Sequence, residues 1–165
     1  MEAFIDKHPK PKQKPLTYEY VRGLAEGEGC FTFYSGWKRR DGSKYKMPAF
    51  VIAMLYRDVE LLEMIRDTLG LRNPIYSRKP YVNPKNGYQV RRTAVLVVRE
   101  FDQLKDIIIP FFYKKLKGHK GRQLNEWLEK IGSDPNISDR YKSLYRLYKW
   151  GMYDTYPKFT QKFVD

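Results

Sequence analysis

The first part of the chain passes from helix-like to strand-like spacing of apolar residues. After Thr17, which can cap a helix, apolar positions recur every three or four residues and predict a helix over residues 17–26. Aromatic residues then alternate with small or polar ones over residues 30–37, which is typical of a strand. A turn that contains Asp41 and Gly42 and a mostly apolar run at residues 47–56 complete a predicted hairpin.

Helical spacing returns at residues 58–69, where Asp58 can cap a helix and Gly70 can end it. Residues 75–79 and 88–99 predict a second hairpin around Asn86 and Gly87. Further helices are predicted from about residue 101 to Pro110 or just past it, and near residues 121–131 and 138–150. The pattern therefore predicts an α+β fold of order αββαββα, with a four-stranded antiparallel sheet and extra C-terminal helices from about residue 121.

The N-terminal residues differ in composition from the rest of the chain. Residues 1–16 are rich in proline and lysine, and Pro9, Pro11 and Pro15 would interrupt a helix. This segment fits either a disordered tail or a basic arm that lies along DNA, and the sequence leaves both open. We expect residues 17–165 to form a single domain, which is long enough to enclose a hydrophobic core.

Charge is strongly positive and is sorted by segment. The chain has a formal net charge of +13. Residues 72–99 carry seven basic and no acidic side chains, and residues 36–57 carry six basic side chains against Asp41 alone. In contrast, residues 58–69 are acidic overall. A surface that serves only solubility would mix both signs, so the two basic segments favour a face that binds nucleic acid.

The sequence also limits the kinds of metal site. Cys30 is the only cysteine, and His8 and His119 are the only histidines, which excludes an internal disulfide framework and a cysteine-based zinc site. Any bound metal should therefore be a hard ion with oxygen ligands, such as Mg²⁺. No stretch resembles a signal peptide and no apolar run could span a bilayer, so we expect a soluble intracellular protein without a membrane partner.

The residues with the most distinctive chemistry lie at positions 20–29. Gly23 and Gly27 are four residues apart, which clears one face of the predicted helix and allows a second backbone to approach closely. Glu26 and Glu28 lie at the C-terminal end of this helix, where the helix dipole disfavours negative charge. Glycines flank Glu28 on both sides, so the chain can turn sharply there and a ligand can come near.

Residues 21–29 resemble the nine-residue motif of the LAGLIDADG homing endonucleases, and a predicted strand follows at once. Arg22 replaces the small residue that is usual at its position, and both acids are glutamate rather than aspartate. The order of elements over residues 17–131 and the basic strand region support the resemblance. It implies the αββαββα endonuclease fold, with the four-stranded sheet as the DNA-binding surface.

In that family, the motif helices of two domains pack together along their glycines, and the last acid of each helix reaches the DNA. One motif per chain therefore implies a homodimer, with Gly23, Leu24, Glu26 and Gly27 at the interface. Glu26 is expected to cap the partner helix, with metal binding as its alternative role. By the same resemblance, Glu28 would hold divalent metal, Mg²⁺, and the backbone carbonyl of Gly27 would be a further ligand.

The family also places a basic residue close to the metal-bound water, near the start of the helix that follows the second hairpin. In this chain Lys117 is the first choice and Lys120 the second, with phosphate contact as the alternative role for either lysine. Met54 occupies the position of a polar residue that is usual in the second strand, and its thioether cannot position water. We expect His119 to contact phosphate rather than act as a base, and Cys30 to pack or to line the groove.

The polar face of the predicted sheet is suited to the major groove of DNA. Strand alternation directs Phe31 and Phe33 inward and Thr32 and Tyr34 outward. Arg92 has the opposite parity from its neighbours and is expected to clamp a phosphate. The residues that we expect to contact DNA are Thr32, Tyr34, Lys38, Arg40, Lys46, Tyr76, Arg78, Gln89, Arg91, Arg92 and Thr93.

Together these features predict a site-specific homing endonuclease that binds double-stranded DNA as a homodimer. It would hydrolyse a long, pseudo-palindromic target with Mg²⁺ and leave short 3′ overhangs. Two alternatives on the same fold stay open: an intron maturase, which would bind intron RNA as a splicing cofactor, and a DNA-binding regulator without catalysis. The presence of Glu28 between two glycines argues against the regulator.

Overall fold

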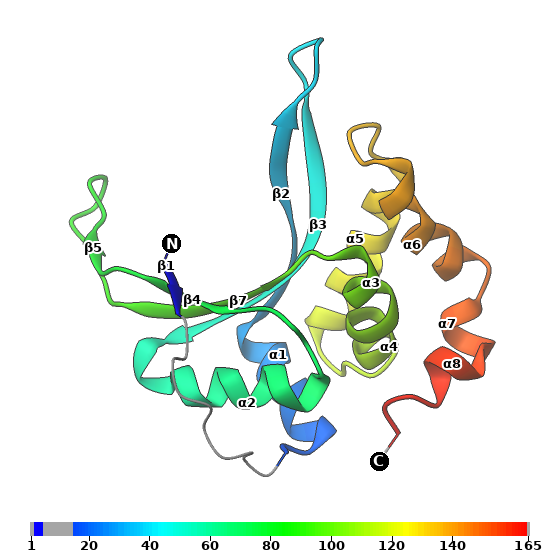
Figure 1. Cartoon of the computed structure of the whole chain (residues 1–165), viewed down its shortest axis with the longest axis horizontal. Coiled ribbons are helices and arrows are strands. Elements are labelled where there is room, and N and C mark those ends of the chain that lie inside the picture. Colours follow the sequence, from blue (N-terminus) through cyan, green and yellow to red (C-terminus); the bar gives the residue numbers. More distant parts are fainter. Residues whose placement is uncertain (1, 5–14, 165) are drawn as a thin grey trace.

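The computed structural model describes residues 2–4 and 15–164 (Figure 1). Its strands are β1 (Glu2–Phe4), β2 (Gly29–Lys38), β3 (Lys44–Leu55), β4 (Ile75–Arg78), β5 (Tyr81–Val82), β6 (Gln89–Val90) and β7 (Thr93–Val98). Its helical elements are α1 (Tyr18–Glu28), η1 (Tyr56–Asp58), α2 (Val59–Leu69), α3 (Phe101–Gln103), η2 (Leu104–Ile108), α4 (Ile109–Phe112), α5 (His119–Ser133), α6 (Asp139–Lys149), α7 (Met152–Thr155) and α8 (Pro157–Thr160). The predicted αββαββα order and the C-terminal helices are confirmed.

The main sheet is antiparallel, with strand order β1-β4-β7-β3-β2. Strands β2, β3, β4 and β7 are the four predicted ones, and β1 adds a fifth strand at the edge by pairing with β4. The pattern of residues 1–16 gave no sign of β1, because three residues are too few for a visible alternation. Residues 5–14, which hold most of the predicted arm, lie outside the described residues.

Helix α1 begins where its sequence predicts but ends later than predicted. The Thr17 side chain accepts a hydrogen bond from the Tyr20 N–H at 3.2 Å, which satisfies one donor of the first turn. The helix continues to Glu28, two residues past the predicted end, and β2 follows directly. A side chain at Gly29 would bring its Cβ to 2.7 Å from the Ala25 carbonyl oxygen, so this abrupt change from helix to strand requires glycine.

The second hairpin differs from the prediction. Strand β4 pairs with β7 only from Tyr76 to Arg78, and the chain between them forms a separate small hairpin, β5–β6. Pro80 and Pro84 lack the N–H that a continuous ladder needs, and Gly87 turns the chain at a φ of 69°. The long second strand predicted at residues 88–99 is therefore divided into β6 and β7.

The predicted end of α2 is confirmed, but its predicted cap is wrong. Gly70 has a left-handed φ of 74° and ends the helix. The Asp58 side chain makes no capping hydrogen bond, because the short η1 turn precedes α2 and gives Asp58 a conformation unsuited to capping. In the C-terminal part, α3, η2 and α4 form one helical run that passes Pro110, and α7 and α8 are short helices that the pattern did not predict.

Helices cover one face of the sheet and share a hydrophobic core with it. Phe31, Phe50, Phe112 and Trp127 join β2, β3, α4 and α5 through ring contacts between 5.0 and 5.8 Å. Figure 1 shows α1 and α2 below the sheet and the C-terminal helices beside it, while the β2–β3 and β5–β6 hairpins project away. Phe31 and Phe33 pack into this core and Tyr34 packs with Ala49 and Val95 on the other face, which confirms the predicted alternation.

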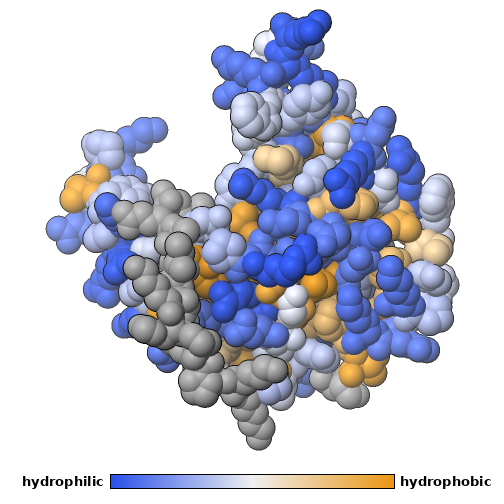
Figure 2. Space-filling model, in the orientation of Figure 1, coloured by the Kyte–Doolittle hydropathy of each residue, from blue (hydrophilic) through white to orange (hydrophobic). Residues whose placement is uncertain are grey.

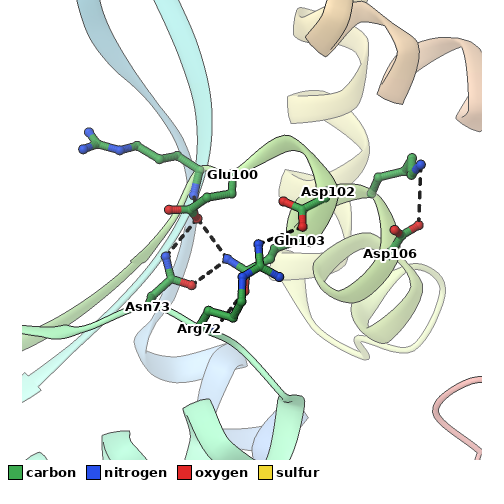
Figure 3. Close-up of polar contacts among 8 residues, drawn as sticks. Arg72, Asn73, Glu100, Asp102, Gln103 and Asp106 are labelled. Atoms are coloured by element: carbon green, nitrogen blue, oxygen red, sulfur yellow. Dashed lines mark hydrogen bonds and ion pairs between the residues drawn. The ribbon is translucent and has the colours of Figure 1, made fainter.

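A polar network fixes the junction between β7 and α3 (Figure 3). The Glu100 carboxylate accepts hydrogen bonds from Asn73 at 2.8 Å and from Gln103 at 3.0 Å, and Gln103 also donates to Asn73 at 2.8 Å. Burial raises the pKa of Glu100, but the hydrogen bonds from Asn73, from the backbone and from Gln103 outweigh it and lower the pKa overall. Arg72 extends the network by its ion pair with Asp102.

Within the described residues, no helix is long and apolar enough to cross a membrane.

Candidate active site and nucleic-acid interface

One face of α1 is open to a partner. An ideal Cβ at Gly23 or at Gly27 would meet no atom within 4 Å. Tyr20, on the same face, leaves 48% of its surface exposed, and Leu24 is half-buried. The two glycines therefore form a shallow, accessible strip on which another helix backbone could lie closely.

The opposite face of α1 is held firmly by its own chain. Val21 and Ala25 are buried in the core. The Arg22 guanidinium donates hydrogen bonds to the carbonyl oxygens of Phe111 at 2.9 Å and Phe163 at 3.2 Å, and it lies 4.4 Å from the centre of the Phe111 ring. Arg22 thus connects the motif helix to α4 and to the C-terminal segment, which explains how this position accommodates a large side chain.

Glu28 is exposed at the last position of α1. Among the described residues, none donates a hydrogen bond to its carboxylate or forms an ion pair with it. Its oxygens and the nearby Gly27 carbonyl are hard donors, which suit a cation such as Mg²⁺. The described residues contain no group of three or more His, Cys, Asp or Glu side chains that could hold a metal ion. The donor set at Glu28 therefore fits a hard divalent cation only if further oxygens come from outside the described chain.

Glu26 organises the loop that carries the predicted catalytic lysine. Its Oε1 accepts hydrogen bonds from the backbone N–H groups of Lys117 and Gly118, the latter at 2.6 Å. Gly118 is the N-cap residue of α5, where the helix dipole favours a nearby carboxylate. The sequence predicted that Glu26 would cap a partner helix, whereas the structure places it on the start of a helix in its own chain. Lys117 and Lys120 lie at this same helix start, with the Lys117 side chain exposed.

Most of the predicted DNA-contacting residues on the main sheet share one face. The register places Thr32 and Tyr34 of β2, Tyr76 and Arg78 of β4, and Thr93 of β7 on the side opposite Phe31. Figure 2 shows mostly hydrophilic residues over the two projecting hairpins, with a small hydrophobic patch on the β5–β6 hairpin. Lys38 and Arg40 are exposed near the tip of the β2–β3 hairpin, and Gln89 and Arg91 are exposed at and after β6.

Two of the predicted contact residues point elsewhere. Lys46 lies opposite Ser35, on the helix side of the β2–β3 hairpin, and its ammonium is 3.1 Å from the Asp134 carboxylate. The Arg92 guanidinium donates a hydrogen bond to the Ser77 hydroxyl at 2.9 Å and stacks 3.6 Å from the Tyr56 ring centre. Arg92 therefore has the opposite parity from its neighbours, as the sequence indicated. The ion pair of Lys46 with Asp134 was not predicted from the sequence.

Three exposed aromatic side chains on the projecting hairpins were missed. Trp37 is 87% exposed near the tip of β2–β3, and Tyr81 and Tyr88 are 54% and 70% exposed on the β5–β6 hairpin. Aromatic rings of this kind can stack on bases or sugars. The sequence contains a signal for Trp37, because this residue directly precedes the basic run Lys38-Arg39-Arg40 in a turn-rich segment.

The profile of the LAGLIDADG endonuclease family matches residues 21–131, which hold the motif helix, both hairpins and α5 up to Ile131. The chain belongs to the LAGLIDADG endonuclease family. The predicted family and fold are thereby confirmed. A comparison with curated proteins finds no match to this chain.

Solved structures of LAGLIDADG homing endonucleases have the same fold. The chain matches I-GzeII in complex with its DNA target with a TM-score of 0.54 and 23% identity over 92% of this chain and 49% of that one. It matches I-SmaMI bound to uncleaved DNA in the presence of calcium ions with a TM-score of 0.55 and 23% identity, over 88% of this chain and 48% of that one. The match to the homing endonuclease I-TnaI has a TM-score of 0.50 and 22% identity, over 83% of this chain and 99% of that one.

This LAGLIDADG chain therefore spans about half the length of I-GzeII and I-SmaMI but nearly all of I-TnaI. Each of the two longer chains has room for a second unit of similar size beside the matched half.

Proposed function

We propose that this chain is a site-specific DNA endonuclease that acts as a homodimer. The observation that carries the proposal is that α1 presents an open Gly23–Gly27 strip and, at its end, the exposed Glu28 carboxylate. Two chains that pair along this strip would bring their Glu28 side chains together at the two-fold axis. One site would then be built from two identical halves, which the lengths of I-GzeII and I-SmaMI support.

The pair of Glu28 carboxylates would hold divalent cations, with Mg²⁺ as the expected ion. When bound, the cations would supply Lewis-acid stabilisation and a more acidic water at the scissile phosphates. Without cations, two carboxylates near the axis and near phosphate would repel each other, so the site depends on metal. The Gly27 carbonyl lies next to Glu28 in the chain and would add a neutral oxygen. The printed description of I-SmaMI, bound to DNA with calcium ions, supports a divalent-metal site.

Lys117 would act beside this site as the residue that stabilises charge on the attacking water or on the phosphate, with Lys120 as the second candidate. The Glu26 contact supports this role, because it fixes the loop with Lys117 to the helix that carries Glu28. The contact holds the Lys117 backbone at the start of α5 and leaves its exposed side chain available to the proposed site.

The sheet face with Thr32, Tyr34, Tyr76, Arg78 and Thr93 would read base edges, and the projecting hairpins would extend the contact along the duplex. Two identical reading faces imply a long target with approximate two-fold symmetry. We propose that both strands are cut near the axis, which would leave short 3′ overhangs. Double-stranded DNA is thus the proposed partner, as the descriptions of I-GzeII and I-SmaMI suggest.

The test starts with selection of a bound duplex from a random pool, followed by cleavage of a supercoiled plasmid that carries the enriched sequence. We expect cleavage with Mg²⁺ and none with a chelator. The Glu28→Gln variant should keep its affinity for the duplex, because basic side chains and counterion release provide most of it. Its cleavage should slow by at least about 100-fold, since the loss of metal stabilisation is worth several kcal/mol.

Glu126→Gln is the matched control, because it makes the same charge change at an exposed position of α5 and should cut at the wild-type rate. Near wild-type cleavage by Glu28→Gln would place the metal site elsewhere. Enrichment of structured intron RNA in place of duplex DNA would favour the maturase alternative. Enrichment of a duplex that is bound but never cut would favour the regulator.

A further inference from the structure

The outer part of the β2–β3 hairpin extends beyond the sheet. Strand β7 pairs with β3 only from Phe50 to Leu55, so residues 44–49 of β3 have β2 as their strand neighbour on one side only. Figure 1 shows this hairpin as the longest projection of the molecule. A hairpin of two strands is at best marginally stable on its own, so its direction in space needs another support.

The loop between α5 and α6, residues 134–137, contacts this outer part at three points. The Lys46 N–H donates a hydrogen bond to the Asn136 carbonyl at 3.0 Å, which continues the hydrogen bonding of β3 where no strand is present. The Lys46 ammonium lies 3.1 Å from Asp134 Oδ2. The Arg39 guanidinium donates to the Pro135 carbonyl at 3.2 Å, close to the turn of the hairpin.

The loop that makes these contacts is itself well fixed. Asp134 Oδ1 accepts the Asn136 N–H at 2.8 Å, and the Lys142 ammonium donates to the Asp134 carbonyl at 2.9 Å. Ile137 is buried in the core. The hydrogen bond from the Asn136 backbone and the nearby Lys46 lower the pKa of Asp134, so its carboxylate is charged at neutral pH. A charged, fixed carboxylate is therefore available to Lys46.

We propose that the α5–α6 loop, through Asp134, is a positioning element that sets the direction of the β2–β3 hairpin and so determines specificity at the outer base pairs of the target. Asp134 acts through Lys46 and does not touch DNA. This inference rests on the proposed function. It also assigns Lys46 to the support of the hairpin, and it gives the C-terminal helices a part in sequence recognition.

The outer base pairs should respond more than the inner ones. The tip of the hairpin carries Lys38, Arg40, Lys44 and the exposed Trp37, and a small rotation at its base displaces this tip furthest. Thr32 pairs with Ala49, directly beside Phe50 where β7 joins β3, and its carbonyl accepts a hydrogen bond from the Trp127 indole at 2.8 Å. Contacts near Thr32 should therefore keep their positions when the loop contact is broken.

The experiment selects bound sequences from a random duplex pool with the full-length wild type, with Asp134→Lys and with Asp139→Lys. Both variants add the same positive charge, but Asp139 is on the exposed first turn of α6, where its side chain is 94% exposed. We expect Asp134→Lys to lose sequence preference at the outer positions of each half-site and to keep it at the inner ones. Its affinity for the duplex that the wild type binds best should fall roughly 3- to 10-fold relative to Asp139→Lys, because the hairpin must then be ordered on binding.

Hydrogen exchange measured in the absence of DNA is an independent test of the hairpin support. Amides of residues 36–48 should exchange faster in Asp134→Lys than in Asp139→Lys, and Asp134→Asn should lie between them because the amide still accepts the Asn136 N–H but lacks charge for Lys46. Equal exchange in all variants, or equal loss of preference at every base pair, would overturn the inference. A wild type that enriches no sequence while the exchange difference persists would instead count against the proposed function alone.

Discussion

The two faces of α1 differ in almost every respect although they belong to the same eleven residues. On one face, Val21 and Ala25 are buried, Arg22 binds backbone oxygens of the C-terminal part, and Glu26 binds the loop before α5. On the other face, an added Cβ at Gly23 or Gly27 would meet no atom of the described residues within 4 Å. The closed face fixes the helix in the fold, and the open face leaves it available to a second chain.

This difference explains which departures from the family motif are tolerated. Arg22 replaces a small residue, but its side chain lies on the closed face and stacks on Phe111. A large side chain there leaves the open strip unchanged. The same substitution at Gly23 would fill the strip, so Gly23 and Gly27 are the positions where a small residue matters for the proposed helix pairing.

The largest expected effect comes from Gly23→Val, which should abolish dimerisation and cleavage while the monomer stays folded. A Cβ at Gly23 would meet no atom of the described residues within 4 Å, and valine is no worse than glycine in a helix interior. It would hold two backbones apart at the strip. Sedimentation should show a monomer, and the thermal midpoint should stay at or above that of the wild type at equal monomer content.

Glu126→Val, on the exposed surface of α5, is the control for an added valine and should stay dimeric and active. An active dimer of Gly23→Val would show that the chains pair elsewhere. A monomeric wild type that still cuts both strands would refute the homodimer itself.

A smaller effect is expected for Arg22→Met, which keeps the apolar stem and removes the two hydrogen bonds to Phe111 and Phe163. The free energy of unfolding should fall by roughly 1–3 kcal/mol, because hydrogen bonds from charged donors are the stronger kind and Arg22 is half-buried. Denaturant titration measures this fall. Arg122→Met, at an exposed position of α5, should change stability little. The dimer should persist in Arg22→Met, since the open face is untouched, and its loss would mean that the two faces are not independent.

The sequence predicted those parts of the fold that depend on local periodicity. Residues 17–26 showed helical spacing and a Thr17 cap, and alternation at Phe31 and Phe33 gave the correct inward face of β2. Short elements were not predicted: β1, β5, α7 and α8 are two to four residues long, which is too short for a periodic pattern to repeat clearly. The sequence contains the prolines of the second hairpin, but the interruption of strand pairing that they cause was not predicted.

The site was predicted as residue types and motif positions but not as contacts. Glu26 and Gly118 are 92 residues apart in sequence, and Arg22 and Phe163 are 141 apart. No spacing rule reports on partners at such distances, so the sequence assigned Glu26 to a partner helix. Lys46 was placed among the DNA contacts for its charge, whereas the pairing of Lys46 with Ser35 puts it on the face opposite Thr32 and Tyr34. Pairing register, which spacing leaves undetermined beyond one strand, decides such cases.

The smallest effect is expected for Glu26→Gln, which tests whether the closed face also serves the chemistry. A neutral amide oxygen can still accept from Lys117 and Gly118, but more weakly than a carboxylate, so stability should fall by about 1 kcal/mol. If the contact positions Lys117, the cleavage rate at saturating DNA should fall several-fold while the affinity for DNA stays unchanged. Single-turnover kinetics separate these two quantities, and Glu126→Gln again matches the charge change. A loss of stability with an unchanged cleavage rate would leave Glu26 a structural role only and would count against its positioning of Lys117.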